Sequence, residues 1–280
     1  MSTRERLEGQ KGGNAVVKEL ADKVAVVTGG AAGIGQGIVE RFAAEGARIV
    51  IADLDTERGE ALAAGYGEEV VFSRVDVADQ DQVARLVTDA VDKFGGLDVM
   101  VNNAGIPSAM HRSLLDDDLA DFHRVMSVNL LGVMVGTREA ARYMAGNGGG
   151  SIVNVSSIGG IQAGPGVMSY RASKAAVIHF TKSAALDLAD HDIRVNCVAP
   201  GHIPTGLLTS SMAGTTEREI RERVAATRAT MRGMRPLRRE GTPHDVAEAV
   251  LYFGSERSAY TTGTVLPLDG GTVAGMVRRT

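Results

Sequence analysis

The sequence contains little cysteine and no excess of positive charge. Cys197 is the one cysteine among the 280 residues, which excludes an internal disulfide and a cysteine-rich metal cluster and is consistent with a reducing compartment. Because it lies in the apolar run IRVNCVAP, we expect a buried structural thiol and not a nucleophile. The formal net charge of −4 and the pI of about 5.9 provide no basic surface, so no nucleic-acid partner is predicted.

Long apolar stretches are missing as well. No segment approaches the roughly 20 apolar residues of a membrane-spanning helix, so no membrane partner is predicted. Residues 1–22 are polar and charged and lack the apolar core of a signal peptide. We therefore expect a flexible N-terminal extension and a cytoplasmic protein. The six histidines show no ligand spacing of the HExxH type, so no metal site is predicted.

What the chain does contain is an alternation of short β-branched runs with helical patterns. Strands are predicted at 23–28, 48–52, 70–76, 99–102, 150–156, 194–198 and 265–268. Helices are predicted at 34–45, 56–64, 80–94, 119–144, 169–189, 217–232 and 243–253. The strands are apolar over most of their length, which is typical of strands covered on both faces. The alternation predicts an α/β fold with a doubly wound parallel sheet of about seven strands and helices on both faces.

No internal repeat or long linker divides the chain. The glycine-rich run at 146–150 is short enough for a helix-to-strand turn. We therefore expect one domain over 23–271, followed by a C-terminal tail at 272–280.

A glycine-rich turn joins the first predicted strand to the first predicted helix. It reads TGGAAGIG at 28–35, and such a turn permits close backbone approach to a pyrophosphate at a helix N-terminus. Gly29, Gly33, Ile34 and Gly35 are the predicted contacts. The spacing is GxxxGxG and not the general dinucleotide fingerprint GxGxxG, so a plain turn is the alternative interpretation.

Acidic residues end the second and third predicted strands. Asp53, followed by Leu54, lies where a carboxylate accepts hydrogen bonds from ribose hydroxyls and repels a 2′-phosphate, which favours NAD over NADP. Arg58 is the nearest cation downstream and is expected to be solvated. Asp76 and Val77 are placed to contact the adenine, although Asp76 is equally suited to capping the following helix.

Tyr170 and Lys174 are four residues apart in YRASK, so a helix places them on one face. A phenol has an ordinary pKa of about 10, and a fixed cation beside it favours the phenolate. Tyr170 is therefore a candidate general acid and base, and Ser157, from a separate segment, is a candidate for holding a substrate oxygen. The alternative is a packed ring beside a solvated amine, which is the commoner meaning of such a pair.

Together these motifs resemble the classical short-chain dehydrogenase/reductases, which have a Rossmann fold. The resemblance extends over about residues 22–271. It rests on TGGAAGIG at 28–35, NNAG at 102–105, Asn129, VSS at 155–157, YRASK at 170–174 and PG at 200–201.

The resemblance implies a catalytic role for four residues. Tyr170 is expected to be the general acid and base, and Lys174 is expected to lower its pKa and to hold the nicotinamide ribose. Ser157 is chosen over Ser156 for orienting the substrate oxygen, because neighbours on a strand point to opposite faces and the family spacing to the tyrosine matches Ser157. Asn129 is expected to hold a water that links Lys174 to solvent, or to be a buried amide bonded to backbone.

The resemblance also implies further cofactor contacts. These are Asn103, Ala104 and Gly105 after the fourth strand, and Pro200, Gly201, Ile203 and Thr205 after the sixth strand. The sequence departs from the family here, because it reads PGHIPTGL, with Pro204 before the threonine and a glycine after it, where the family often has a variable residue and then proline. A substrate lid is expected at about 205–236.

The function implied by the resemblance is that of an NAD-dependent oxidoreductase for a secondary alcohol or ketone. Ile158, Gln162, Val167 and Met168 near the tyrosine favour a hydrophobic small-molecule substrate. The alternatives are a 3-oxoacyl-carrier-protein reductase that uses NADPH, which Asp53 disfavours, and a catalytically silent cofactor sensor, which the presence of the catalytic residues disfavours. The family commonly forms homotetramers through its long helices, where apolar residues such as Val133 and Val177 serve either an interface or the core.

Overall fold

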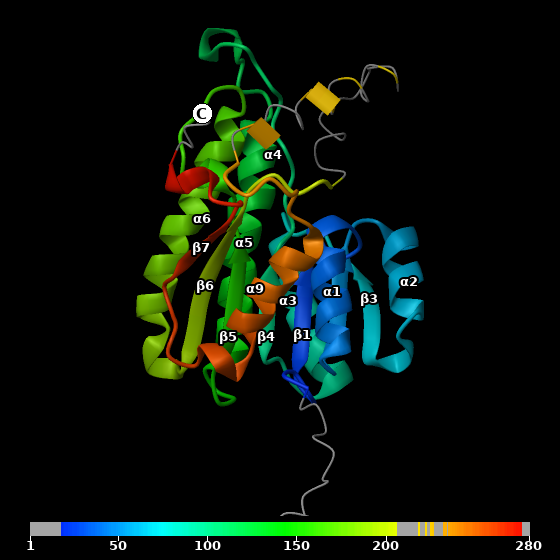
Figure 1. The fold of residues 1–280 in the computed structure, drawn as a ribbon. Coiled ribbons are helices and arrows are strands. Elements are labelled where there is room, and N and C mark those ends of the chain that lie inside the picture. The colour runs from blue at the N-terminus through cyan, green and yellow to red at the C-terminus, as the bar shows by residue number, and fades with distance from the viewer. Residues whose placement is uncertain are drawn as a thin grey trace, which may run out of the picture.

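Seven parallel strands form one sheet at the centre of the protein (Figure 1). The computed structural model describes residues 18–205 and 235–275, together with 218, 222, 225–226 and 232–233. The strands are β1 (Val24–Thr28), β2 (Arg48–Asp53), β3 (Val70–Arg74), β4 (Val99–Asn102), β5 (Gly150–Val155), β6 (Ile193–Pro200) and β7 (Val265–Leu268). Their order is β3-β2-β1-β4-β5-β6-β7, and all neighbours are parallel. This is the predicted Rossmann-type fold.

Helices cover both faces of the sheet. On one face lie α1 (Gly33–Ala44), α2 (Thr56–Ala64) and α9 (Pro243–Gly254), and on the other α3 (Gln80–Phe94), α5 (Gly132–Met144) and α6 (Met168–Asp187). The short helix α4 (Phe122–Met126) precedes α5. Figure 1 shows α1 and α9 side by side in front of the sheet.

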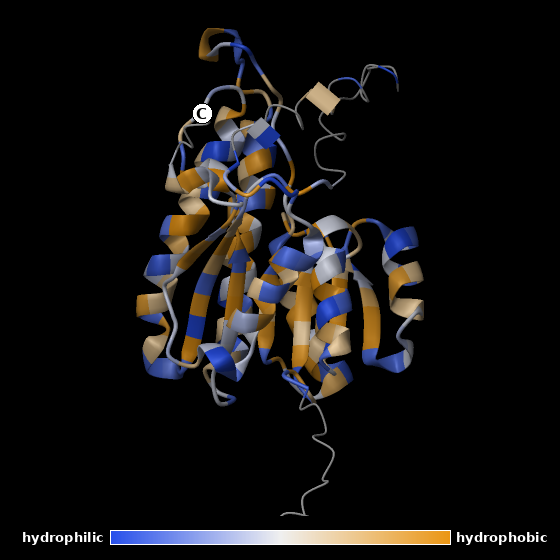
Figure 2. Ribbon diagram, in the orientation of Figure 1, coloured by the Kyte–Doolittle hydropathy of each residue, from blue (hydrophilic) through white to orange (hydrophobic). Residues whose placement is uncertain are grey.

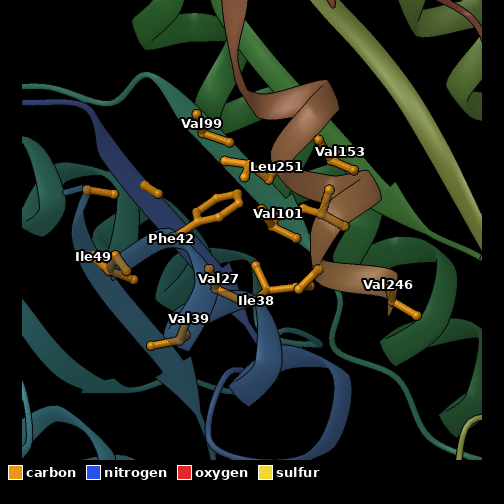
Figure 3. Packing of buried hydrophobic residues seen from close by; sticks show 14 of the residues in the cluster. Val27, Ile38, Val39, Phe42, Ile49, Val99, Val101, Val153, Val246 and Leu251 are labelled. Carbon is orange, nitrogen blue, oxygen red and sulfur yellow. The ribbon is translucent and has the colours of Figure 1, made fainter. Parts of the chain in front are cut away.

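The strands are buried on both faces, and their side chains divide between two cores. In β1, Ala25 and Val27 belong to the core under α1 and α9, whereas Val26 belongs to the core under α3 and α5. All three are fully buried, and the strands are accordingly apolar in Figure 2. In Figure 3 the ring of Phe42 from α1 packs near Leu251 of α9; burying one such side chain contributes about 2–3 kcal/mol.

Most predicted elements are confirmed to within two residues. The sixth strand is longer than predicted, because it pairs with β5 from Ile193 and with β7 as far as Pro200. Most of the predicted helix 217–232 and most of the predicted lid 205–236 lie outside the described residues. Val133 and Val177 are buried within the chain itself, so the single chain already uses both in its core.

The predicted helix 119–144 is wrong in two respects. Leu119 has a left-handed backbone with φ of 54°, so the helix begins only at Phe122. A π-helical turn, Ser127–Leu131, then separates α4 from α5. Such turns occur mostly as single insertions in α-helices and frequently at functional sites.

None of the helices in the described part of the chain combines the length and the apolarity that crossing a bilayer requires.

Candidate active site

A cavity of about 500 Å³ opens at the carboxyl ends of the strands, where the strand order reverses between β1 and β4. In open α/β sheets this is the crevice where ligands bind. The predicted site residues that line it are Gly29, Gly33, Ile34, Gly35, Asp53, Leu54, Val77, Asn103, Ala104, Gly105, Ser157, Tyr170, Lys174, Pro200, Gly201, Ile203 and Thr205. Segments from across the whole sequence therefore meet at one place. Asp76 and Asn129 are the two predicted residues that do not line it.

The glycine turn has a conformation that requires glycine. Gly29 and Gly33 have φ of +64° and +58°, a region that glycine adopts without strain. A Cβ on Gly35 would overlap the Gly29 carbonyl oxygen. Helix α1 follows at once, with Ala32 as its N-cap, no capping side chain and no acidic residue in its first turn. Gly33, Ile34 and Gly35 at the helix N-terminus line the cavity, and no side chain caps their N–H groups, as an anion site requires.

Thr28 and Asn103 join this turn to the NNAG segment. The Thr28 hydroxyl accepts hydrogen bonds from the backbone N–H of Asn103 at 3.0 Å and of Ala104 at 3.1 Å. The Asn103 amide donates to the carbonyl oxygens of Thr28 at 2.9 Å and Gly29 at 3.0 Å. Both donor hydrogens of Asn103 are thus used within the protein, and the residue holds the turn in place.

Both carboxylates predicted to contact the cofactor are held by backbone N–H groups. Asp53 accepts from Ala31 at 3.0 Å and from Asp55 at 3.1 Å, so its position beside the turn is fixed. Asp76 accepts from Ala78 at 2.9 Å, and it lies outside the cavity lining. Its observed role is capping a tight turn, and the N-cap of α3 is a different residue, Asp79.

Arg58 lies at the edge of the same cavity. Its side chain is largely exposed and its Nε lies 3.5 Å from an Asp55 carboxylate oxygen. The solvated cation that the sequence predicted is therefore also a weak ion-pair partner.

Tyr170 and Lys174 lie on one face of α6, as their spacing predicts. The Lys174 Nζ is 5.9 Å from the centre of the Tyr170 ring and donates a hydrogen bond to the Val155 carbonyl at 2.9 Å. The side chain is 4% exposed, and this burial lowers the pKa of Lys174 from 10.5 to about 8.

The pKa of Tyr170 shifts in the direction opposite to the prediction. Burial raises it, and the hydrogen bond with Ser157 and the positive charge of Arg171 oppose the rise only partly. The reason is that Lys174 directs its ammonium to a backbone carbonyl at the end of β5. Desolvation of the phenol is therefore the larger effect.

The two adjacent serines have separate functions. Ser156 is buried and donates to the Lys174 carbonyl at 2.7 Å, which fixes β5 against α6. Ser157 forms the hydrogen bond with Tyr170 and accepts from the Gly159 N–H at 3.1 Å. This arrangement agrees with the prediction that Ser157, and not Ser156, orients the substrate oxygen. The catalytic role of Ser157 stays a prediction.

Asn129 lies in the π turn and is fully buried. Its amide oxygen accepts from the Ile106 N–H at 2.8 Å, and its amide nitrogen donates to the Ile106 carbonyl at 2.9 Å. A Cβ on Gly105 would lie 3.3 Å from both the Asn129 oxygen and the Lys174 Nζ. Asn129 thus holds in place the segment 105–106, which lies between Asn129 and Lys174. These bonds agree with the alternative prediction that Asn129 is a buried amide bonded to backbone.

Several residues that line the cavity were not predicted from the sequence as site residues. They are Ala31, Ala32, Ala52, Asp55, Val75, Ile106, Val128, Val155 and Ser156. Most contribute backbone or small apolar side chains, so only the fold brings them to the cavity. Their adjacency to predicted motif residues was the one available signal.

Two other sequence predictions concern reactive side chains. Cys197 is buried, and burial raises the pKa of its thiol to about 11, so the predicted structural role is confirmed. His111, Asp117 and Asp118 lie outside the cavity lining, with one potential ligand atom each within 4.8 Å of the others. Both carboxylates accept backbone N–H groups in their own turn, and we assign no metal to this group.

Comparisons with known proteins agree with the geometry. Residues 29–273 match a family model described as "Enoyl-(Acyl carrier protein) reductase". The chain is 42% identical to the sex determination protein tasselseed-2 of Zea mays, over 91% of this chain and 82% of the relative. It is 40% identical to 3beta-hydroxysteroid dehydrogenase 2 of Eggerthella lenta, over 90% of this chain and 95% of the relative.

A solved structure of levodione reductase superposes with a TM-score of 0.84 at 32% identity, and the match covers 91% of this chain and 99% of that one. Members of the matched family are oxidoreductases that use a nicotinamide cofactor. The chain belongs to the short-chain dehydrogenase/reductase family.

Proposed function

We propose that the protein is an NAD-dependent dehydrogenase/reductase that interconverts a secondary alcohol and a ketone. The observation that carries the proposal is that the Tyr170–Ser157 pair and Lys174 line the same cavity as the glycine turn. A nucleotide cofactor and an alcohol oxygen can therefore be held within one site.

The residues around the cavity fit a dinucleotide. The uncapped N-terminus of α1 offers backbone N–H groups to a pyrophosphate. Gly35 allows the turn to close tightly, since a Cβ there would overlap the Gly29 carbonyl oxygen. Asp53 is fixed at the end of β2, where it would accept from ribose hydroxyls and repel a 2′-phosphate. Arg58, the cation at this edge, already faces Asp55, which favours NAD over NADP.

The proton chemistry is assigned to side chains of this chain. When bound, the nicotinamide cofactor supplies or accepts the hydride. Ser157 holds the substrate oxygen, and Tyr170 donates a proton to it in reduction or removes one in oxidation. Lys174, held by the Val155 carbonyl on the cavity wall, would donate to the hydroxyls of the nicotinamide ribose.

Because Tyr170 is buried, the rates of ketone reduction and alcohol oxidation are expected to depend differently on pH. Because its pKa is raised, the phenol is the form present at neutral pH, and this form is the proton donor that ketone reduction needs. Alcohol oxidation needs the phenolate, so its rate should increase as the pH rises toward the pKa of Tyr170.

The proposed substrate is a secondary alcohol or ketone on an apolar ring system. One relative is named for a hydroxysteroid, and the similar structure is named for a dione. Ile161 on the loop that follows Ser157, and Met110, which lies beside Gly166 at the end of that loop, leave large apolar side chains exposed. An apolar ring provides the surface to cover them.

The test is a panel of cyclic and open-chain secondary alcohols and ketones, followed by nicotinamide absorbance with NAD(H) and with NADP(H). We expect kcat/KM to be at least about tenfold higher with NAD(H), which corresponds to about 1.4 kcal/mol at the ribose. Tyr170→Phe should abolish turnover while cofactor binding persists. A preference for NADPH would refute the cofactor assignment, and full turnover by Tyr170→Phe would refute the mechanism.

A second candidate is reduction of a 3-oxoacyl thioester. A relative from Thermotoga maritima, 40% identical over 91% of this chain and named a 3-oxoacyl-[acyl-carrier-protein] reductase, favours it. The same assay with a 3-oxoacyl thioester and NADPH separates the candidates, since only this one predicts fast turnover of that pair.

A further inference from the structure

Arg171 directly follows Tyr170 on α6, but its side chain does not line the cavity. It points instead to the loop at residues 158–166, which follows Ser157. Its Nη1 donates to the Gln162 carbonyl at 2.9 Å. The Nε of Arg171 is buried and has no hydrogen-bond partner among the described residues. Arg171 is half-buried, with the Nε covered by protein and the Nη1 bonded to the loop.

The loop is shaped around this guanidinium by two glycines. A Cβ on Gly164 would lie 2.5 Å from the Arg171 Nη2 and 2.8 Å from its Cζ, and a Cβ on Gly159 would lie 3.7 Å from its Nη1. Any side chain at Gly164 would therefore displace the guanidinium.

The start of the loop packs on α6, because a Cβ on Gly160 would lie only 2.6 Å from the Lys174 carbonyl carbon. Beyond Gly160 the loop has few hydrogen bonds to other elements of the described chain. Within it, Ile161 and Gln162 donate only to the Ile158 carbonyl. At its far end, the Gly166 carbonyl accepts from the N–H of His111 at 3.0 Å. In the described part of the chain, the middle of the loop has one further hydrogen bond to another element, which Arg171 of α6 donates to the Gln162 carbonyl.

This matters for the active site because the same loop sets the orientation of Ser157. The Ser157 hydroxyl accepts from the Gly159 N–H at 3.1 Å, and its carbonyl accepts from Gly160 at 2.9 Å. If the loop moves away from α6, both contacts to Ser157 are released.

We propose that Arg171 is a positioning residue for the hydride-transfer reaction: its guanidinium holds the 158–166 loop against α6 and thereby fixes the Ser157 hydroxyl relative to the Tyr170 phenol. The inference rests on the proposed function, since it assigns Arg171 a role through Ser157 and Tyr170. Arg171 has a second effect through its charge, which favours the phenolate of Tyr170.

The groups that act on the Tyr170 phenol come from two elements. Arg171 and Lys174 are on its own helix, and Ser157 faces it from the end of β5. Cys197 in β6 interacts with Lys174 and not with Tyr170. Lys174, with its pKa lowered to about 8, also titrates in the alkaline range. It is present in the wild type and in every Arg171 variant, so a difference between their pH profiles reports the Arg171 charge.

The experiment compares Arg171→Met and Arg171→Lys with the wild type, using an alcohol that the wild type oxidises. Lys182→Met is the matched control, because it removes a positive charge from an exposed position of the same helix. For Arg171→Met we expect kcat/KM to fall about tenfold, the equivalent of a hydrogen bond from a charged donor. The alkaline limb of the pH–rate profile of this variant should move to higher pH by about half a unit.

Cofactor affinity, measured by calorimetry, should stay unchanged in Arg171→Met, because Arg171 does not line the cavity. Arg171→Lys should return the pH limb to the wild-type position, since it keeps the charge. Lys182→Met should match the wild type throughout.

The inference is overturned if Arg171→Met has wild-type kcat/KM and pH limb, if it loses cofactor affinity together with turnover, or if Arg171→Lys does not restore the limb. Tyr170→Phe in the same assay separates this result from the proposed function. An active Tyr170→Phe refutes the function, whereas an inactive Tyr170→Phe beside an unaffected Arg171→Met refutes only the role of Arg171.

Discussion

The burial of Lys174 makes the stability of this protein depend on pH in a way that one substitution can isolate. Lys174 is 4% exposed, and its pKa falls from 10.5 to about 8 on folding. At about 1.4 kcal/mol for each pKa unit, burying the ammonium costs about 3 kcal/mol when the lysine is charged in both states. Below about pH 8 the folded protein carries this cost in full.

The cost is relieved as the pH rises. Above about pH 8 the folded state releases the proton of Lys174, whereas the unfolded chain keeps it up to about pH 10.5. Since the unfolded state then binds more protons, the free energy of unfolding increases with pH. Integration over these pKa values gives a relative gain of about 2 kcal/mol between about pH 7 and about pH 9.5.

Lys174→Met removes this dependence. The variant also loses the hydrogen bond to the Val155 carbonyl, but that loss does not vary with pH and cancels in the comparison. We expect the free energy of unfolding of the wild type, minus that of Lys174→Met, to increase by about 2 kcal/mol over this range. Lys182→Met, at an exposed position of α6, should show no such slope.

The assay is reversible urea denaturation without cofactor, at one protein concentration, because bound ligand and assembly both alter apparent stability. Equal m values in all variants would establish that the same unfolding transition is compared. A difference that stays constant between about pH 7 and about pH 9.5 would refute the reasoning. It would mean that the Lys174 ammonium is solvated or paired in the folded protein.

Two further predictions concern the turn and the thiol. Gly35→Ala should abolish cofactor binding in calorimetry, because its Cβ would overlap the Gly29 carbonyl oxygen; binding within a few-fold of the wild type would show that the turn does not contact the cofactor. Cys197 should react with a thiol reagent only as fast as the chain unfolds, since it is buried and its pKa is raised to about 11. Rapid modification of the native protein at neutral pH would contradict this burial.

The strands and most helices were predictable because their signals are local. Apolar runs such as β4 and the helical spacing of α3 have the predicted bounds. The π turn was not predictable, because the apolar pattern of 119–144 continues through it and its cause is tertiary. The buried amide of Asn129 bonds both backbone groups of Ile106, a partner more than twenty residues away that no sequence period reveals.

The candidate site was likewise predictable only in its local features. The motif residues that surround the cavity could be named from their order in the chain, but their contacts could not. Lys174 was expected to lower the pKa of Tyr170, and its ammonium is instead directed to Val155. For Asp76 the sequence left an adenine contact and a capping role open, and its carboxylate accepts from the Ala78 N–H. In both cases a backbone group bonds the polar side chain, and only the fold determines which backbone groups are in reach.

Three departures from ordinary local rules gather around the same cavity. Helix α1 begins with alanine as its N-cap, which costs about 1 kcal/mol relative to serine or aspartate. Asn129 lies in a π turn, and Lys174 is a buried amine at a cost of about 3 kcal/mol from its pKa. Folded proteins retain such costs mainly where function requires them. The three residues belong to the motifs of the family resemblance, and the energetic costs are a second, physical reason to place the site at this cavity.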